Sequence, residues 1–189
     1  MTNFTVIYDA CVLYSAPLRD LLMHLAITDL YRAKWTNEIH EEWIVNLLSN
    51  RKELKRDFLE RTREQMNVNV RDCLIENYQW LIPSLNLPDA NDRHVLAAAI
   101  CSSSSVIVTY NLKDFPKKIL DQYGIETQHP DEFIVNLFDL SFEMVCMAAR
   151  RHRASLKNPP KNIEQYLATL EKQALSKTVK KFTEYLELL

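Results

Sequence analysis

The sequence contains a single glycine, Gly124, among 189 residues. A Walker loop, a GxGxxG dinucleotide fingerprint and a GxSxG nucleophile elbow each need at least two glycines, so none of them is present. No HExxH zinc motif occurs either. The four cysteines form no CxxC or CxxH pair, so we expect free, mostly buried thiols and no zinc site. These cysteines are Cys11, Cys73, Cys101 and Cys146.

Long apolar segments are also missing. The longest apolar runs, such as residues 95–100, are far shorter than the roughly 20 residues that span a bilayer. Residues 1–6 do not begin the basic-then-apolar pattern of a signal peptide. We therefore expect no membrane segment and a cytoplasmic location.

The composition is that of an ordinary globular protein, with 47% hydrophobic and 25% charged residues. A chain of this length can bury a sizeable core without disulfide or metal cross-links. The net charge of −2 argues against a general nucleic-acid binder. However, residues 1–140 carry 14 Lys/Arg and 20 Asp/Glu, whereas residues 141–189 carry 9 and 5. The sequence therefore joins an acidic body to a basic tail.

Strands and helices are expected to alternate along the first part of the chain. Residues 4–8 and 105–109 are rich in β-branched and aromatic residues and predict strands, with shorter strands at 34–36 and 125–127. Apolar periodicity and capping residues predict the helices between them. These helices cover residues 17–29, a segment capped by Thr36 or Asn37, and residues 52–65, 89–102 and 117–123, the last stopped by Gly124. The alternation indicates an α/β fold with a parallel sheet between helices.

Residues 69–82 show no clear pattern. After Pro130 the sequence predicts only helices, at about 131–139, 141–155, 162–174 and 176–188, with a break at Asn158-Pro159-Pro160. We therefore expect residues 136–189 to be an appended helical piece.

Several acidic residues fall just beyond expected strand ends. Asp9 directly follows the first strand, Glu41 and Glu42 open the helix after the second, and Asp114 follows the 105–109 strand. Because ligand sites of open α/β sheets form outside the carboxyl ends of the strands, these groups should meet at one edge. Asp92 opens the preceding helix, and topology alone does not place it there.

Such a cluster of carboxylates points to a hard cation. Carboxylates repel one another unless a cation lies among them, and Mg²⁺ and Mn²⁺ take oxygen ligands. Bound in this way, these ions activate water for phosphoryl displacement.

Each acid also has a purely structural explanation. Asp89 is favoured as a helix N-cap, and Asp92 can serve the helix dipole. The three glutamates at 38, 41 and 42 can form a solvated helix face, and Asp114 can cap a loop. Asp9 is the hardest to explain structurally, because a charge at the end of an apolar strand is costly if it is buried.

Taken together, four segments resemble the PIN domain, and within it the VapC type of toxin. They are residues 6–13 (VIYDACVL), Trp35-Thr36 with Glu42, residues 87–98 (LPDANDRHVLAA) and residues 108–116 (VTYNLKDFP). The resemblance covers about residues 4–135 and implies a PIN-like, mostly parallel sheet flanked by helices. It implies a nuclease domain over residues 1–135 and a helical C-terminal extension over 136–189. Residues 150–175 resemble, more loosely, the extension of one VapC subgroup.

The resemblance also implies one Mg²⁺ or Mn²⁺ pocket. The acids that carry over are Asp9, Glu42, Asp92 and Asp114, both as metal ligands and as catalytic residues. Glu42 is preferred to Glu41 because the acid of the family usually falls six residues after the small hydroxyl residue, here Thr36. Asn111 stands where many members have an acid. It is an auxiliary candidate, together with Asp89, Glu41 and Thr109.

The expected function is a metal-dependent endoribonuclease, the toxin of a toxin–antitoxin pair. The expected partners are RNA, a cognate antitoxin and a second copy in a homodimer. Arg150, Arg151 and Arg153 of the basic tail are the expected RNA contacts, unless they form a solvated face or a partner surface. The alternatives are a catalytically silent PIN scaffold, a PIN nuclease of RNA processing or DNA without an antitoxin, and a metal phosphatase.

Overall fold

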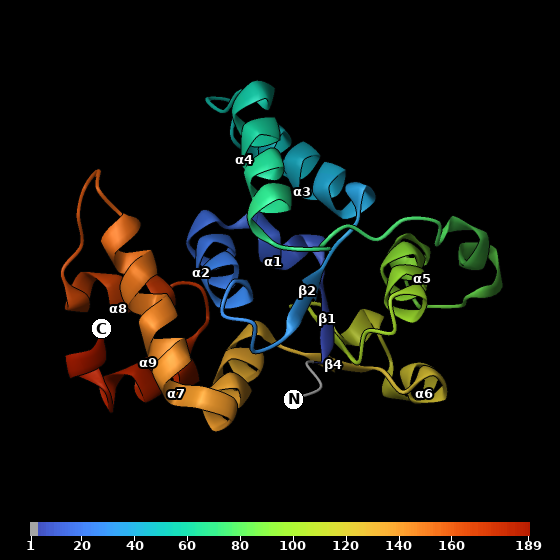
Figure 1. Cartoon of the computed structure of the whole chain (residues 1–189). Helices are drawn as coiled ribbons and strands as arrows, with labels where there is room; N and C mark the ends of the chain where they lie inside the picture. Colours follow the sequence, from blue (N-terminus) through green and yellow to red (C-terminus); the bar gives the residue numbers. More distant parts are fainter. Residues whose placement is uncertain (1–3) are drawn as a thin grey trace. The chain divides into compact units, whose positions relative to one another are not determined.

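The structure, a computed structural model, describes residues 4–189. Residues 1–3, part of the segment judged not to be a signal peptide, lie outside the described residues. The described part contains a four-stranded, all-parallel sheet in the order β2-β1-β3-β4 (Figure 1). The strands are β1 (Thr5–Tyr8), β2 (Arg32–Lys34), β3 (Val106–Val108) and β4 (Glu126–Gln128). The predicted α/β class with a parallel sheet between helices is confirmed.

The order of the strands reverses in the middle of the sheet. The chain passes from β1 to β2 on one side and later places β3 on the other side of β1. Ile7 of β1 therefore has Lys34 as its neighbour on one side and Ile107 on the other. In open α/β sheets such a reversal opens a crevice at the carboxyl ends of the two strands. The topology therefore makes the region beyond Tyr8 and Val108 the expected place for a ligand site.

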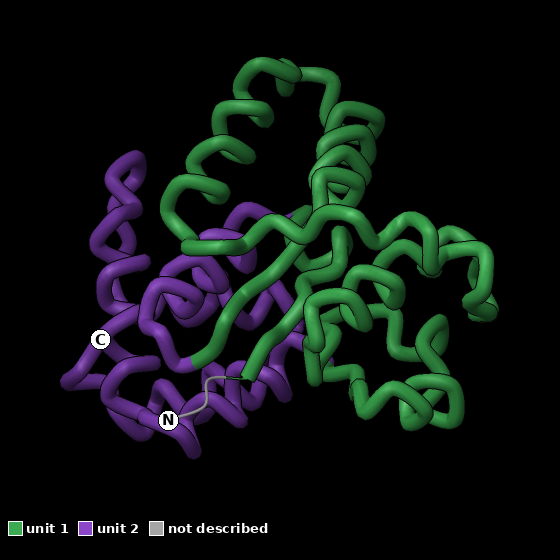
Figure 2. The backbone as a smooth tube through the Cα atoms, turned by 45° about the vertical axis from the view of Figure 1, so that its right-hand side comes forward, with its two compact units in different colours: residues 1–14, 31–128 green, residues 15–30, 129–189 purple. Residues whose placement is uncertain are grey.

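The chain divides into two compact units, drawn in different colours in Figure 2. Unit 1 comprises residues up to Tyr14 and Tyr31–Gln128 and contains the whole sheet. Within it α1 packs on α3, and α5 packs against β1. Its helices are α1 (Ala10–Tyr14), α3 (Asn37–Asn50), α4 (Arg56–Asn69), α5 (Arg93–Cys101) and α6 (Lys117–Leu120). Its short 3₁₀ helices are η1 (Gln79–Ser84), η2 (Ala90–Asp92), η3 (Leu112–Asp114) and η4 (Asp121–Tyr123).

The structure contains the local interactions predicted at two helix boundaries of unit 1. The hydroxyl of Thr36 accepts a hydrogen bond from the backbone N–H of Ile39 at 3.0 Å and caps α3, as predicted. Gly124 adopts a left-handed conformation, with φ of +66°, directly after η4. A side chain is strained in this conformation, which is why the only glycine of the chain marks this stop.

Two other predicted elements are displaced along the chain. The strand expected at residues 34–36 lies at Arg32–Lys34, because Trp35 pairs with Leu74 instead of continuing the sheet. The helix expected at 52–65 is α4 at Arg56–Asn69. Residues 51–55 form the turn after α3, with the N–H of Leu54 donating to the carbonyl of Arg51 at 3.1 Å.

Unit 2 combines an early helix with the C-terminal helices. It comprises Ser15–Leu30 and His129–Leu189, and within it α2 packs along α7. Its helices are α2 (Ala16–Ala26), α7 (Pro130–Ser155), α8 (Ile163–Glu171), α9 (Ser176–Thr183) and the 3₁₀ helix η5 (Leu186–Leu188). The predicted boundary after residue 135, between a nuclease domain and a C-terminal extension, stays a prediction. The compact units follow packing and are discontinuous in sequence.

The capping interactions of unit 2 fix where its helices begin. Ser141 is non-helical within α7, with φ of −164° and ψ of 102°, so the predicted break between two helices at residue 140 is confirmed. Asn162 and Gln165 form a capping box at the start of α8. The carboxylate of Asp131 accepts hydrogen bonds from the backbone N–H groups of Lys177 and Thr178 at 2.9 and 2.8 Å. No helix within residues 4–189 has both the length and the apolar character to span a bilayer.

A buried polar network joins α3 and α4. The side-chain oxygen of Asn67 accepts a hydrogen bond from the indole N–H of Trp35 at 2.8 Å and lies 2.9 Å from His40 Nε2. Trp43 donates its indole N–H to His40 Nδ1 at 3.1 Å, so the His40 proton resides on Nε2 and is donated to Asn67. Trp35 and His40 are completely buried, so neither can turn to water for a replacement partner.

We predict that Asn67→Ala lowers the free energy of unfolding by about 2–4 kcal/mol. The substitution removes the acceptor of two buried N–H donors, and each unsatisfied donor costs about 1–3 kcal/mol. The measurement is urea unfolding followed by circular dichroism. Asn69→Ala is the matched control, since Asn69 is exposed on the same helix and bonds only a backbone carbonyl of α4. It should change stability by less than about 0.5 kcal/mol. Equal effects of the two substitutions would contradict the proposed role of the network.

Candidate active site

Asp9 lies at the carboxyl end of the central strand β1 and is only 2% exposed. Its Oδ1 accepts a hydrogen bond from the N–H of Ala10 at 2.7 Å. Its Oδ2 accepts hydrogen bonds from the hydroxyl of Thr109 at 2.6 Å and from the thiol of Cys11 at 3.1 Å. Burial raises the pKa of Asp9, and these hydrogen bonds to the carboxylate oppose that rise. Asp9, the acid that was hardest to explain structurally from the sequence, is therefore buried, and hydrogen bonds hold its carboxylate in place.

Thr109 connects Asp9 to the loop after β3. Its hydroxyl oxygen accepts a hydrogen bond from the backbone N–H of Asn111 at 2.9 Å, while the side chain of Asn111 is exposed. Cys11 Sγ lies 3.3 Å from Thr109 Oγ1 and accepts a hydrogen bond from the N–H of Tyr110 at 3.3 Å. Burial raises the pKa of the Cys11 thiol far above its ordinary value, so this group is a neutral donor to Asp9.

Asp92 ends η2 and stands at the N-terminus of α5. Burial raises the pKa of Asp92 to about 7, and the charges of Asp9, Asp89, Asp114 and Glu42 raise it as well. Carboxylates act on one another in this way only at short range. The structure therefore brings the four predicted metal-binding acids, together with Asp89, into one electrostatic neighbourhood.

The direction of α5 explains how Asp92 reaches this edge. After α5 the chain arrives at Ser105, whose N–H donates to the carbonyl of Thr5 at 2.9 Å, at the amino end of β1. The C-terminus of α5 thus lies at the amino ends of the strands, and its N-terminus lies toward their carboxyl ends. The N-cap explanation for Asp89 also holds, because its carboxylate accepts a hydrogen bond from the N–H of Asn91 at 2.8 Å.

The neighbouring glutamates of α3 have different partners. Glu41 forms an ion pair with Arg56 of α4 at 2.5 Å, and the hydrogen bond from Arg56 lowers the pKa of Glu41. Glu42 Oε2 lies 3.4 Å from Nε2 of His94 on α5. Successive helical residues project about 100° apart, so one glutamate faces α4 while the other faces α5. This placement agrees with the preference for Glu42 as the site residue.

Sequence reasoning missed His94. It is 7% exposed, and its two ring nitrogens face Glu42 at 3.4 Å and Glu38 at 3.8 Å. Burial alone would lower the pKa of His94, but the hydrogen bond to Glu42 and the nearby carboxylates raise it. Glu38 in turn accepts a hydrogen bond from the hydroxyl of Tyr78 at 3.0 Å. The available signal was the position of His94 on the first turn of the helix that Asp92 opens.

A divalent cation fits the chemistry of these donors. Among residues 4–189 no three His, Cys, Asp or Glu side chains already stand at the spacing of a metal site. The donor set is nevertheless composed of carboxylate oxygens, which hard cations prefer. Burial is the main cause of the raised pKa of Asp92, and the repulsion by neighbouring carboxylates that adds to it is what a cation would relieve. Asp9, Glu42, Asp92 and Asp114 are the residues that would hold it.

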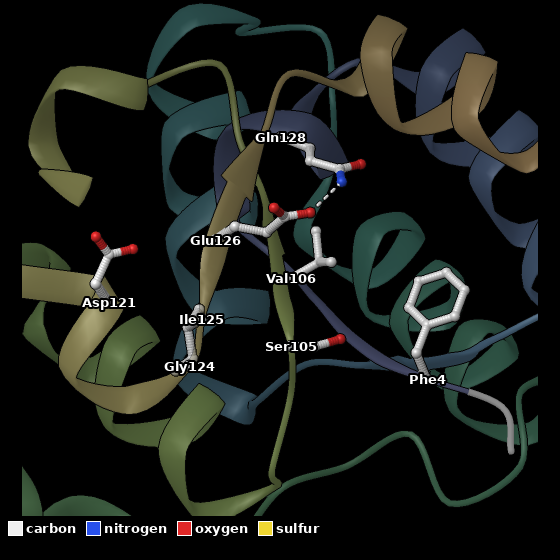
Figure 3. A pocket seen from close by; sticks show the side chains of 8 residues that line it. All are labelled: Phe4, Ser105, Val106, Asp121, Gly124, Ile125, Glu126 and Gln128. Carbon is white, nitrogen blue, oxygen red and sulfur yellow. Dashed lines mark hydrogen bonds between the residues drawn. The ribbon is translucent and has the colours of Figure 1, made fainter.

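A second concave region of unit 1 lies away from these acids. An open groove of about 430 Å³ lies beside β3 and β4. The side chains that line it are drawn in Figure 3. It is lined by Phe4, Ser105, Val106, Asp121, Gly124, Ile125, Glu126 and Gln128. Phe4, Ser105 and Ile125 directly precede β1, β3 and β4, so the groove extends to the amino ends of the strands. Gln128, the last residue of β4, lines it as well, so the groove runs along β4, and it contains none of the predicted site residues.

The three arginines predicted to contact RNA differ in their surroundings within unit 2. Arg150 and Arg151 are exposed on α7. Arg153 donates from Nη1 to the carbonyl of Lys161 at 3.2 Å and from Nη2 to the carbonyl of Leu189 at 3.0 Å. Its guanidinium thus joins the loop before α8 to the residue that follows η5, while Arg150 and Arg151 present their side chains to solvent.

The comparisons with known proteins agree with this architecture. Residues 5–113 match the PIN domain family, and residues 130–184 match the VapC50 C-terminal domain. The first match covers more than half of the chain, which therefore belongs to the PIN-domain family. The predicted resemblance to PIN domains of the VapC type is confirmed.

One relative adds a functional name. A Mycobacterium tuberculosis protein named "Putative ribonuclease VapC50" is 48% identical over 63 residues. The aligned part is 33% of this chain and 37% of that protein, so the match spans little more than a third of the relative. No solved structure matched the chain.

We predict that Asp92→Asn stabilises the metal-free protein at about pH 8. Aspartate has a pKa of about 3.9 in unfolded chains, against about 7 here, so the folded state is penalised increasingly as the pH rises from about 4 to 7. The substitution removes this penalty. Because Asp92 is only partly buried, the expected gain is about 1–2 kcal/mol rather than the full value of the shift.

Urea unfolding in EDTA at about pH 4 and about pH 8 measures this effect. The stabilisation should be present at the higher pH and absent at the lower one. Asp139→Asn is the control, since Asp139 is an exposed residue of α7. If Asp92→Asn destabilised the protein at the higher pH, the carboxylates would not be repelling one another.

Proposed function

We propose that this protein is a metal-dependent endoribonuclease of the VapC type, the toxin of a toxin–antitoxin pair. The observation that supports the proposal is the environment of Asp92, whose pKa is raised by burial and also by the charges of Asp9, Asp89, Asp114 and Glu42. Membership in the PIN-domain family and the ribonuclease name of the relative support it. The Cys11 thiol is kept neutral by burial and is therefore a poor nucleophile for this site.

The reaction is the hydrolysis of a phosphodiester. The oxygen of water attacks phosphorus and gives one proton to a carboxylate, while the bond from phosphorus to the leaving oxygen breaks and that oxygen takes a proton from solvent to become a hydroxyl group. When bound, Mg²⁺ or Mn²⁺ activates the water and stabilises the charge on the phosphoryl oxygens. Asp9 is oriented for this task by Thr109 and Ala10, which fix both of its oxygens. Asp92 is a partly exposed carboxylate at the N-terminus of α5, and we assign it the role of proton acceptor.

The substrate needs positive charge, because an edge lined by carboxylates repels phosphates. Arg150 and Arg151 are exposed in the basic part of the chain and are the residues we assign to RNA contacts. Arg153 is assigned a structural role instead, since two of its nitrogens already donate to backbone carbonyls. Binding through Arg150 and Arg151 would weaken as salt rises, as phosphate contacts do.

The proposal includes the partners and the location of such a toxin. A cognate antitoxin would inhibit by placing a basic side chain, best an arginine, among the carboxylates, since arginine pairs with carboxylates in a bidentate manner. A homodimer and a cytoplasmic location, where RNA targets are available, complete the proposal.

We predict that Asp9→Asn and Asp92→Asn each reduce RNA cleavage at least about 100-fold while the protein stays folded. Loss of groups that merely support metal ligands costs about 10–100-fold, and loss of a ligand should cost no less. Cleavage of fluorescently labelled RNAs is measured with Mg²⁺, with Mn²⁺ and with EDTA, and circular dichroism checks the fold. Asp139→Asn should cut like the unaltered protein. Cleavage that persists in EDTA, or in either site variant, would refute the proposed function.

A further prediction distinguishes the two adjacent glutamates. Glu42→Gln should lower the cleavage rate at least about 10-fold, because Glu42 faces His94 beside the acidic site. Glu41→Gln should change the rate less than about 3-fold, because it breaks only the exposed ion pair with Arg56. The two rates are compared under saturating Mg²⁺. The opposite ranking would show that Glu41 is the functional acid.

A further inference from the structure

His94 lies beside the acidic site, and the proposed reaction assigns it no role. It is on the first turn of α5, two residues after Asp92, and only 7% of it is exposed. Asp92 opens this helix, so both residues stand at the same end of α5. They belong to unit 1, as do Asp9 and Glu42.

The ring of His94 contacts two glutamates of α3 that lie one helical turn apart. Its Nε2 is 3.4 Å from Oε2 of Glu42, and its Nδ1 is 3.8 Å from Oε2 of Glu38. Residues four positions apart on a helix project from the same face, so α3 turns both carboxylates toward α5. An ionised carboxylate only accepts hydrogen bonds, so the Nε2 that faces Glu42 is the nitrogen that carries a proton. The imidazole therefore joins α5 to α3 beside the site.

Glu38 is itself held in place from the core of unit 1. Its carboxylate accepts a hydrogen bond from the hydroxyl of Tyr78 at 3.0 Å, and Tyr78 is only 2% exposed. The buried Nδ1 of His94 has no hydrogen-bond partner among residues 4–189, so at 3.8 Å its contact with Glu38 is electrostatic. A line of contacts thus runs from the buried Tyr78 to the half-exposed Glu42.

Glu42 needs such a restraint more than Asp9 does. Asp9 is buried, and hydrogen bonds fix both of its oxygens. The side chain of Glu42 is 42% exposed and has one more rotatable bond than an aspartate. Among residues 4–189, the group in ion-pair contact with its carboxylate is the imidazole of His94. Without this contact, Glu42 would have to give up more rotational freedom on binding a cation.

We propose that His94 is a positioning residue, which holds the carboxylate of Glu42 ready to bind the divalent cation and is itself held by Glu38. Groups that orient metal ligands in this way typically account for about 10–100-fold in metal affinity. This role rests on the proposed function, because it takes Glu42 to be a metal ligand. A purely structural histidine would join α3 to α5 without any effect on the affinity for the metal.

The first experiment measures the affinity of the full chain for Mn²⁺, without RNA, by electron paramagnetic resonance of the free ion. His94→Leu replaces the ring by an apolar group that cannot donate, so Mn²⁺ should bind about 10–100-fold more weakly. His94→Gln keeps an N–H donor near the end of the side chain, so its affinity should stay within about 3-fold of the unaltered protein. Unchanged affinity in His94→Leu, or equal losses in the two variants, would overturn the proposal.

A control variant separates positioning from stability. His40→Gln changes a completely buried histidine that bonds to Trp43 and Asn67 in the network between α3 and α4. It should lower the free energy of unfolding, measured in EDTA, but leave the Mn²⁺ affinity within about 2-fold. A loss of Mn²⁺ affinity in His40→Gln equal to that in His94→Leu would show that the effect is one of stability, and it would overturn the proposal.

Tyr78→Phe tests the far end of the line and leaves His94 in place. It removes the hydroxyl that holds Glu38, so it should weaken Mn²⁺ binding at least about 2-fold, the smallest loss expected for one hydrogen bond. Tyr123→Phe is the matched control, since Tyr123 is exposed on η4 and precedes the turn into β4. Equal affinities in these two variants would overturn the part assigned to Glu38.

A double-mutant cycle shows whether His94 acts through Glu42. Protein with both Glu42→Gln and His94→Leu should bind Mn²⁺ no more weakly than Glu42→Gln alone, because the group that His94 positions is already lost. Losses that add up would mean that His94 affects the metal by another route, and they would overturn the proposal. In EDTA, the NMR signals of the His94 ring should also move in Glu42→Gln, whereas those of His24 in unit 2 should not.

The failure of this role can be told apart from the failure of the proposed function. If His94→Leu weakens Mn²⁺ binding as expected but the unaltered protein cuts no RNA, the function is wrong and the role of His94 stands. If Mn²⁺ affinity is unchanged in His94→Leu while RNA cleavage is lost in Asp9→Asn, the role is wrong and the function stands. If the unaltered protein binds no Mn²⁺, Glu42 holds no metal and the role is refuted.

Discussion

A buried negative charge at the end of the central strand governs the organisation of unit 1. Asp9 cannot turn away to water, because the backbone of β1 fixes its position and Thr109, Ala10 and Cys11 fix its oxygens. Any further carboxylate that the fold brings to this edge must meet that charge. Asp92 does so, and the charge of Asp9 adds to the effect of burial in raising the pKa of Asp92. Binding of a cation at this edge would therefore stabilise the fold by mass action and prepare the site for chemistry at the same time.

The sequence contains most of the information that determines this architecture. The apolar residues of β1 and β3, the cap at Thr36 and the turn at Gly124 are local features, and the structure contains each of them. Elements without a local signal were not predicted. The helix α1 has only five residues and begins directly after Asp9, so it is too short for apolar periodicity to indicate it. The start of α4 depends on how the chain turns back after α3, which is a property of packing.

The candidate site, too, could be predicted from the sequence only in part. Asp9, Glu42 and Asp114 follow strand ends, so topology predicts that they meet. The family resemblance was needed to place Asp92, although the direction of α5 is sufficient once the sheet is known. His94 and Cys11 could not be chosen from the sequence, because their importance lies in distances to Glu42 and Asp9. The role of Arg153 is equally invisible in a charge count, which treats it like Arg150 although it is bonded to the backbone of its own unit.

The discontinuity of unit 2 has a consequence for biosynthesis. α2 carries a stripe of buried leucines, but the helix α7 on which it packs begins roughly 100 residues later. At translation rates of about 5–20 residues per second, α2 waits about 5–20 s after its own synthesis for its partner. During this interval its apolar stripe is available to chaperones or to other nascent chains. The stripe consists of Leu18, Leu21, Leu22 and Leu25.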